Sequence, residues 1–142
     1  MRKIKLPPDV LFHHDLRLMV FRPRGVLNEK VVDRIVNFLK QAEEQADKPF
    51  NRYSDLSQLK AIKLEYQYVL RISLHRRASY AKFTPVKSAF YVTNQEATSI
   101  VEIHAIVCDY SPLQVAMFKE VPAAAEWLGV SPDDLQIGNE TT

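Results

Sequence analysis

His104 and Cys108 are the two residues of this sequence whose types and spacing could do chemistry together. They are four residues apart in a stretch with helical periodicity, so both side chains lie on one face of the predicted helix. An imidazole and a thiol in this arrangement could ligate a metal ion or form a thiolate–imidazole pair. Two ligands are too few for a tetrahedral zinc site, and a third, such as Asp109 or His75, would have to come from elsewhere. Because cysteine also packs as a small apolar residue, a core role for the pair is favoured.

The segment from Arg71 to Lys87 is basic and contains no acidic residue. Aromatic residues surround it, and an aromatic, basic surface can bind an anionic lipid headgroup, a nucleic acid or an acidic protein. The alternative is a solvated helix end, because the helix dipole favours cations there. The sequence after Lys119 has no Lys or Arg, so a basic middle and an acidic end could meet within one molecule or across a dimer. The candidate ligand or partner surface consists of Arg71, His75, Arg76, Arg77 and Lys82.

Two other groups of polar residues are interpreted as parts of the fold rather than as functional sites. His13, His14 and Asp15 could ligate a metal, but neighbouring residues of a strand point to opposite faces, so we interpret them as a turn. Glu43, Glu44 and Asp47 could be paired carboxylates, but the helical pattern predicts a solvated helix end for them.

Glycine usage excludes the common phosphate-binding loops. These loops need several glycines close together, where backbone N–H groups approach an anion. The chain has three glycines, and they are widely separated. Neither a P-loop nor a dinucleotide fingerprint is therefore expected, although strands alternate with helices in this sequence.

Bulk composition is that of one globular domain. The chain has 142 residues, of which 46% are hydrophobic and 25% are charged, and its net charge is +2. So small a charge gives no reason to expect nucleic acid as a partner. The single cysteine suits a reducing compartment, and neither a signal peptide nor a membrane-spanning run is recognised. We therefore expect a cytoplasmic protein.

The hydrophobic periodicity predicts strands alternating with helices. A hairpin is expected over residues 10–22, with a better-buried face on its second strand. Helices are expected at 29–46 with Asn28 as N-cap, at 57–80 with Ser57 as N-cap, and at 94–108 with Thr93 or Asn94 as N-cap. In the helix at 57–80, Tyr66 and Leu70 are among the residues expected to face inward. The further strands are expected at 50–56, 86–93 and 113–121.

The C-terminal part of the pattern is a short helix that begins near Pro122 and ends at Gly129, followed by one more turn from Ser131. The order of elements is β-β-α-β-α-β-α-β-α, which implies parallel crossovers in a mixed sheet. We expect one domain at residues 10–138, an N-terminal arm at 1–9 and a frayed C-terminus at 139–142.

This pattern resembles the STAS-like proteins, and more closely the SpoIIAA-like branch that also carries the name STAS/SEC14 domain. The resemblance rests on the order of elements, on the strand end Tyr53-Ser54-Asp55-Leu56-Ser57 and on the ending from Ala116 to Leu128. It implies an α/β fold with a mixed sheet of four or five strands flanked by about four helices. It also implies a protein-interaction or ligand-binding role.

The phosphorylation switch of anti-sigma factor antagonists is not carried over by this resemblance. In those proteins the strand is followed by an Asp-Ser-Ser-Gly-like turn, whose serine is phosphorylated at a helix N-terminus. Asp55-Leu56-Ser57 matches the first part, but residues 60–65 take the place of the second and contain no serine. Ser57 is left as a candidate modified serine, and an N-cap role explains it without a function.

The sequence therefore predicts a non-enzymatic interaction or regulatory module that works as a homodimer or with another protein and needs no cofactor or metal. The alternative is a carrier or sensor for a small apolar or anionic, lipid-like ligand. In that case the helices at 57–80 and 94–108 would form an apolar cleft, with Arg71, Arg76 or Arg77 at the ligand's acidic group. No constellation of residues points to an enzyme.

Overall fold

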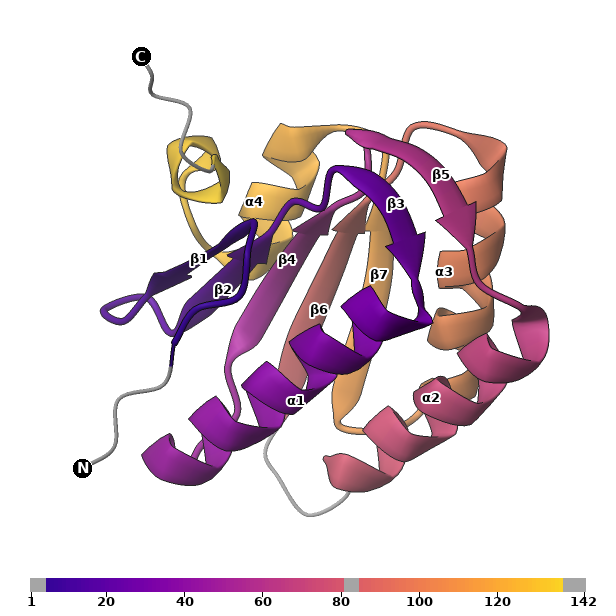
Figure 1. The fold of residues 1–142 in the computed structure, drawn as a ribbon. Coiled ribbons are helices and arrows are strands. Elements are labelled where there is room, and N and C mark those ends of the chain that lie inside the picture. Colours follow the sequence, from indigo (N-terminus) through magenta and orange to yellow (C-terminus); the bar gives the residue numbers. More distant parts are fainter. Residues whose placement is uncertain (1–4, 81–84, 137–142) are drawn as a thin grey trace.

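The computed structural model describes residues 5–80 and 85–136 of the chain, and its elements are shown in Figure 1. Lys82 and the expected frayed end at 139–142 lie outside the described residues. In chain order the elements are β1 (Val10–His13), β2 (Leu18–Phe21), β3 (Gly25–Asn28), α1 (Glu29–Ala46), β4 (Asn51–Asp55), β5 (Leu59–Lys63), α2 (Tyr66–Ser79), β6 (Val86–Tyr91), α3 (Gln95–Val107), β7 (Leu113–Phe118), α4 (Val121–Leu128) and the 3-10 helix η1 (Pro132–Leu135).

The main sheet has five strands in the order β1-β2-β4-β6-β7. β1 and β2 pair antiparallel, as the predicted hairpin requires, and the other three pairings are parallel. The sheet is therefore mixed, with its parallel part formed by strands that alternate with helices. This architecture confirms the α/β fold class and the mixed sheet expected from the sequence.

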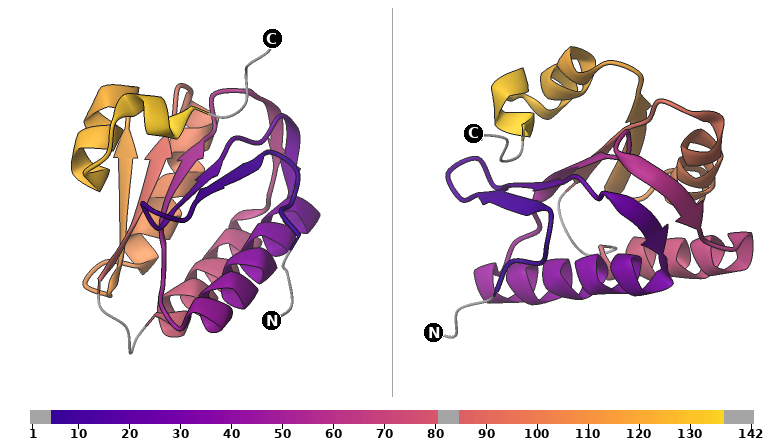
Figure 2. Two further views of the ribbon diagram at one scale, coloured as in Figure 1. Left: turned by 90° about the vertical axis from the view of Figure 1, so that its left-hand side faces the viewer. Right: turned by 45° about the horizontal axis from the view of Figure 1, so that its top comes forward.

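Helices cover both faces of this sheet (Figures 1 and 2). α1 packs on one face through Phe38 and Leu39, next to α2 and α3. α4 and η1 pack on the opposite face, where Ala124 and Leu128 meet Tyr53 of β4. Because both faces are covered, all four residues of β2 are buried, whereas the sequence predicted one better-buried face.

A second sheet of two parallel strands, β3 and β5, corrects the prediction of a helix over 57–80. Residues 59–63 form strand β5, and α2 begins only at Tyr66. Leu59 and Ile62 are three residues apart, a spacing that favours a helix. So short an apolar run does not by itself decide between a helix and a strand. Pairing with β3, which is distant in sequence, decides between the two.

The inward face of α2 also differs from the prediction. Tyr66 and Leu70 are 60% and 45% exposed, although the sequence placed them inside. The helix instead buries Tyr68, Val69, Ser73 and Arg76. The misreading follows from the helix's composition, because its apolar residues are spread around the axis and mark no single face.

The helix termini follow the local signals that the sequence carries. Asn28 accepts a hydrogen bond from the Val31 amide at 3.0 Å, and Asn94 accepts one from the Ala97 amide at 2.8 Å. Gly129 ends α4 with a φ of 77°, in the left-handed region that favours glycine. These three predicted termini are confirmed. Within the described residues, no helix is both long and apolar enough to cross a bilayer.

Candidate functional site

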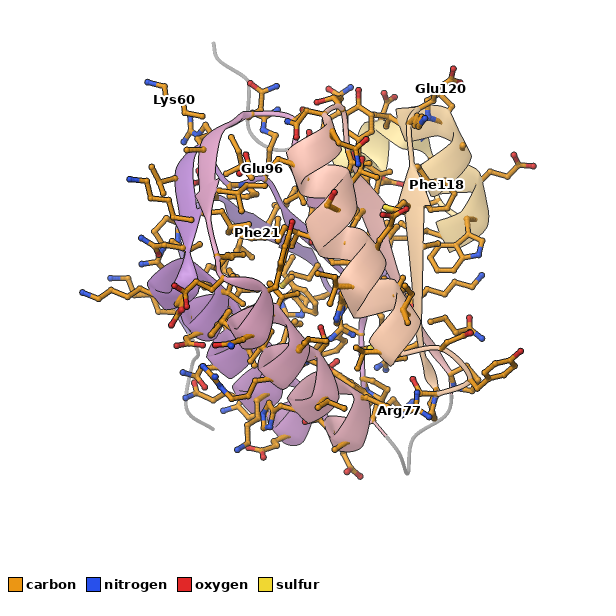
Figure 3. All side chains as sticks on the ribbon, turned by 90° about the vertical axis from the view of Figure 1, so that its right-hand side faces the viewer. Phe21, Lys60, Arg77, Glu96, Phe118 and Glu120 are labelled. Carbon is orange, nitrogen blue, oxygen red and sulfur yellow. The ribbon has the colours of Figure 1, made fainter. Side chains whose placement is uncertain are left out.

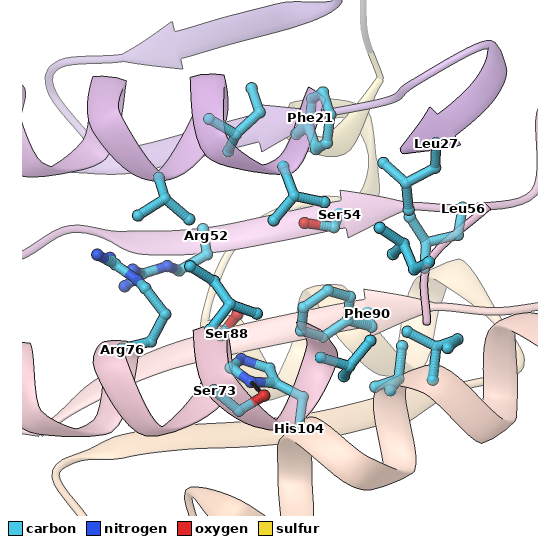
Figure 4. Close-up of a pocket in the computed structure, with 18 of the residues that line it drawn as sticks. Phe21, Leu27, Arg52, Ser54, Leu56, Ser73, Arg76, Ser88, Phe90 and His104 are labelled. Atoms are coloured by element: carbon cyan, nitrogen blue, oxygen red, sulfur yellow. Dashed lines mark hydrogen bonds between the residues drawn. The ribbon is translucent and has the colours of Figure 1, made fainter. Parts of the chain in front are cut away.

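A cavity of about 150 Å³ lies between the main sheet and the three helices that cover one of its faces (Figure 4). The sheet contributes its floor, and α1, α2 and α3 form its other walls. Most of the lining is apolar, with a cluster of polar groups. From the main sheet the lining residues are Met19, Phe21, Arg52, Ser54, Ser88, Phe90 and Leu113; from β3, the helices and the connections they are Leu27, Val32, Ile35, Val36, Leu39, Leu56, Leu64, Tyr68, Val69, Ile72, Ser73, Arg76, Ile100, Val101 and His104.

The polar groups of the cavity floor come from the centre of the sheet. In β4, Arg52 and Ser54 face the cavity, while Tyr53 between them packs against α4 on the opposite face. Arg52 pairs in register with Ser88 of β6, which also faces the cavity. Central strands of a parallel sheet covered on both faces are normally apolar throughout. Polar residues at alternate positions of two neighbouring strands therefore indicate a site rather than ordinary core.

Four side chains meet at the polar end of the cavity. Nη2 of Arg52 donates to the hydroxyl of Tyr80 at 2.5 Å, and Nη2 of Arg76 donates to the same hydroxyl. The Tyr80 hydroxyl in turn donates to Oε1 of Glu43, whose Oε2 lies 3.9 Å from Nη1 of Arg52. Oε2 also accepts the backbone N–H of Phe50 at 2.8 Å. All four side chains are buried, with at most 9% of each residue exposed.

The charges in this cluster do not balance. Two guanidinium groups face a single carboxylate, since burial raises the pKa of Tyr80 and keeps its phenol neutral. Arg52 and Arg76 line the cavity, whereas Glu43 lies behind them and does not. No acidic side chain belongs to the described lining. The polar end of the cavity is consequently a buried site with one positive charge in excess.

Ser73 and His104 form a second polar contact on the cavity wall. The Ser73 hydroxyl lies 2.8 Å from Nδ1 of His104, and Sγ of Cys108 lies 3.8 Å from the same nitrogen. Burial, with a smaller effect from Arg52 and Arg76, lowers the pKa of His104 to about 4. Burial also raises the pKa of Cys108 to about 11. At neutral pH the imidazole and the thiol are both uncharged.

The structure places the predicted pair His104 and Cys108 close together, as the helical spacing indicated. Cys108 is 2% exposed and packs with Val86 and Leu113. His104 faces the cavity and stacks edge-on against Phe90. The described residues contain no group of three or more His, Cys, Asp or Glu side chains that could hold a metal ion.

The candidate surface on the basic segment does not form one face. Arg71 is exposed, with its guanidinium 5.5 Å from the Tyr68 ring centroid, and His75 is exposed as well. Arg76 is 5% exposed and points into the cavity. Nη1 of Arg77 donates to the carbonyls of Val107 and Asp109, which joins the end of α2 to the end of α3 (Figure 3). Arg76 alone of these described residues lines the cavity.

Two other predictions are corrected by the contacts of the residues concerned. Glu43 was expected on a solvated helix end, as Glu44 and Asp47 indeed are, but it is buried and neutralises part of the arginine pair. Ser57 does not cap a helix, because it lies between β4 and β5. Its N–H and hydroxyl both donate to Oδ1 of Asp55, at 2.9 and 2.6 Å.

His13, His14 and Asp15 separate in the way expected for a strand that enters a turn. Nε2 of His13 contacts the backbone carbonyl of Asp134 at 2.8 Å, while the His14 ring packs edge-on against Phe12. Asp15 is exposed in the turn. The side chains of His13 and His14 therefore have different neighbours.

Arg52, Ser54 and Ser88 were missed by reasoning from the sequence. The available signal was polar residues at alternate positions of a strand whose other residues are buried. This alternation indicates a site only when both faces of β4 and β6 are known to be covered. An exposed strand face would show the same alternation.

The mixed five-stranded sheet, with three helices on one face and α4 on the other, defines an α/β protein with a SpoIIAA-like fold. A solved structure of similar fold is that of an uncharacterised DUF3478-family protein from Shewanella loihica PV-4, described as SpoIIAA-like. The match has a TM-score of 0.52 at 16% sequence identity and covers 78% of this chain and 83% of that one. No family model and no curated protein matches the sequence. The likeness establishes the fold, and the cavity is the basis for proposing a function.

Proposed function

We propose that this protein is a binding module, a carrier or sensor, for a small and mainly apolar ligand held in the cavity. The observation that carries the proposal is the cavity itself, about 150 Å³ in volume between the sheet and α1, α2 and α3. An apolar cavity of about this volume is known to bind a molecule of the size of benzene. The expected ligand is therefore small, with a body of about six carbon atoms.

The proposed role is non-enzymatic and needs no cofactor. A serine nucleophile requires a base that accepts its proton, and the pKa of His104 near 4 makes the imidazole a weak base. Among the described residues, no carboxylate contacts His104 to orient its ring. The raised pKa of Cys108 leaves little thiolate at neutral pH. These groups are better suited to lining a pocket than to attacking a substrate.

The family resemblance of the sequence is in line with this proposal. Its STAS/SEC14 name implies a ligand-binding or carrier role, and the predicted acid-binding arginine of such a carrier was Arg71, Arg76 or Arg77. Of these three, Arg76 lines the cavity. The walls contributed by α2 and α3 correspond to the apolar cleft expected between these helices.

Binding of hexan-1-ol, a neutral probe of suitable size, tests the proposal. We expect saturable shifts of backbone amide signals from cavity-lining residues in the NMR spectrum of the full chain. The variant Ser54→Leu replaces one oxygen with three carbon atoms inside the cavity, and should fold but lose hexan-1-ol binding. Filling an apolar void also offsets part of the cost of the substitution.

The control is Ser79→Leu, which makes the same change at an exposed residue of α2 outside the cavity. This variant should bind hexan-1-ol as the unchanged protein does. The proposal is wrong if the unchanged protein gives no saturable shifts, or if Ser54→Leu binds as tightly as Ser79→Leu. Native mass spectrometry of the freshly purified protein should also show a retained small molecule.

A second candidate function is self-association as a homodimer through the outer face of α2. Tyr66, Leu70 and Leu74 follow one another at intervals of four residues and are 60%, 45% and 59% exposed. This spacing aligns them in one apolar stripe along the helix. Such a stripe would bury apolar area against a second copy.

A further inference from the structure

The arginine pair at the polar end of the cavity has donors that the protein does not use. Within the described residues, Nη2 of Arg76 donates to Tyr80, while its Nε and Nη1 make no hydrogen bond. The residue is nevertheless 5% exposed and lines the cavity. A buried guanidinium normally has its donors satisfied, because leaving them without partners has a large desolvation cost. These donors are therefore available to a ligand.

Two hydroxyl groups of the cavity floor are also available. Ser54 and Ser88 line the cavity on neighbouring strands, and neither hydroxyl has a hydrogen-bond partner among the described residues. Both residues are buried, at 7% and 3% exposed. Figure 4 shows the guanidinium groups of Arg52 and Arg76 together at one end of the cavity, with the apolar side chains of Phe21 and Leu27 toward the opposite end. The cavity is thus polarised along its length.

The net charge of the site determines which ligand charge the site favours. Arginine stays protonated in proteins, so Arg52 and Arg76 bring two positive charges, and Glu43 offsets one. Among the described residues, one positive charge remains without a counter-ion at this buried end of the cavity. A ligand with a single negative charge would complete the balance, while a phosphate monoester would bring between about 1.5 and 2 negative charges at pH 7.

We propose that the ligand is a small monocarboxylate, whose carboxylate binds Arg76 and Arg52 and whose apolar body extends toward Phe21 and Leu27. This assignment rests on the proposed ligand-binding function and adds the chemical class of the ligand. The planar guanidinium of Arg76 matches a carboxylate through two parallel N–H···O bonds. Ser88 pairs in register with Arg52 and so lies on the carboxylate side of the cavity floor, whereas Ser54 pairs with Phe21 beside the apolar body.

A matched pair of probes tests the charge assignment apart from the binding function. Hexanoate and hexanamide have nearly the same shape, but one is an anion and the other is neutral at pH 7. We expect the unchanged protein to bind hexanoate at least about tenfold more tightly by NMR titration, a preference of about 1.4 kcal/mol or more. Equal binding of the two probes would overturn the carboxylate assignment and leave the binding function standing. Failure of hexanoate, hexanamide and hexan-1-ol alike would overturn both.

The variant Arg76→Met tests whether Arg76 is the side chain that recognises the negative charge of the ligand. It keeps a long apolar side chain and removes the guanidinium, so it should lose the preference for hexanoate over hexanamide. Arg71→Met is the control, since Arg71 is exposed on the same helix and lies outside the cavity lining. A preference that survives in Arg76→Met would contradict the proposal. Should Arg76→Met fail to fold, the probe pair on the unchanged protein still decides the ligand class.

Hexyl phosphate distinguishes a carboxylate site from a phosphate site. The charge balance predicts weaker binding of hexyl phosphate than of hexanoate at pH 7.5, where the phosphate is mostly dianionic. Tighter binding of hexyl phosphate would overturn the assignment of a monocarboxylate.

Discussion

Polar side chains in the central, parallel strands of the sheet distinguish this molecule from a domain whose core is entirely apolar. Arg52, Ser54 and Ser88 occupy positions where apolar residues would pack against the helices. Truncating one partner of a buried ion pair costs roughly 3–5 kcal/mol, while a well-packed apolar replacement of the whole pair is often neutral. A core selected for stability alone would therefore not need this cluster. The donors of Arg76 that have no partner among the described residues are the reason for proposing a ligand at this cluster.

The residue-scale prediction concerns His104 and the dependence of stability on pH. The folded protein lowers the pKa of His104 to about 4, through burial first and then through Arg52 and Arg76. The unfolded chain, with an ordinary value near 6.5, binds the proton more tightly. The free energy of unfolding should therefore be fully retained above about pH 7 and fall as the pH drops toward 4. Between pH 7 and pH 5 this one group should account for a loss of about 2 kcal/mol.

Urea unfolding at the two pH values measures this loss. The variant His104→Asn has no group to titrate and should lose less stability than the unchanged protein over the same interval. His75→Asn is the matched control on an exposed histidine of α2, and should behave like the unchanged protein. Identical pH dependence in the unchanged protein and in His104→Asn would contradict the prediction.

At the scale of elements, the sequence predicted those helices whose beginnings carry a local signal. α1 and α3 begin at Asn28 and Asn94, whose side chains cap the helix, and α4 has a proline in its first turn. α2 begins after Glu65, which makes no side-chain capping bond, and this beginning was misplaced. β5, directly before it, depends on pairing with β3, about 35 residues earlier in the chain. Local periodicity cannot report such a pairing.

The prediction at this scale is the contribution of the Asn28 cap. Its side chain accepts the Val31 amide at 3.0 Å and satisfies one of the unpaired donors at the start of α1. Asn28→Ala should lower the free energy of unfolding by about 1 kcal/mol, measured by urea denaturation. Asn37→Ala makes the same change on the exposed side of α1, where alanine favours the helix, and should be neutral or slightly stabilising. Equal unfolding midpoints for the two variants would show that the cap contributes nothing.

At the scale of the whole molecule, the cavity is a property of layers that no single element contains. The carrier alternative drawn from the sequence expected an apolar cleft between two helices with Arg71, Arg76 or Arg77 at it. The cavity lies instead between the sheet and α1, α2 and α3, and Arg76 lines it. The sequence did not reveal Arg52 or the buried role of Glu43, because each depends on which face of β4 or α1 is covered. A basic residue in a strand and an acidic residue near a helix end are most often solvated. Only the packing of α1 and α2 against the sheet brings Arg52 and Glu43 to Arg76.

The outer surface of the molecule supports one further prediction, on self-association. Residues Leu70 and Leu74 lie on the exposed stripe of α2, away from the cavity. If this stripe forms the homodimer contact, the double variant Leu70→Glu, Leu74→Glu should weaken association at least about tenfold, because it removes buried apolar area and adds four like charges across the dimer. Sedimentation equilibrium should show a dimer for the unchanged protein and a monomer for this variant, with the same helical circular dichroism.

The control is Leu6→Glu, Leu16→Glu, which changes two exposed leucines on the N-terminal segments and should stay dimeric. An unchanged protein that is monomeric at every concentration would exclude self-association through α2 and leave the cavity as the sole proposed site.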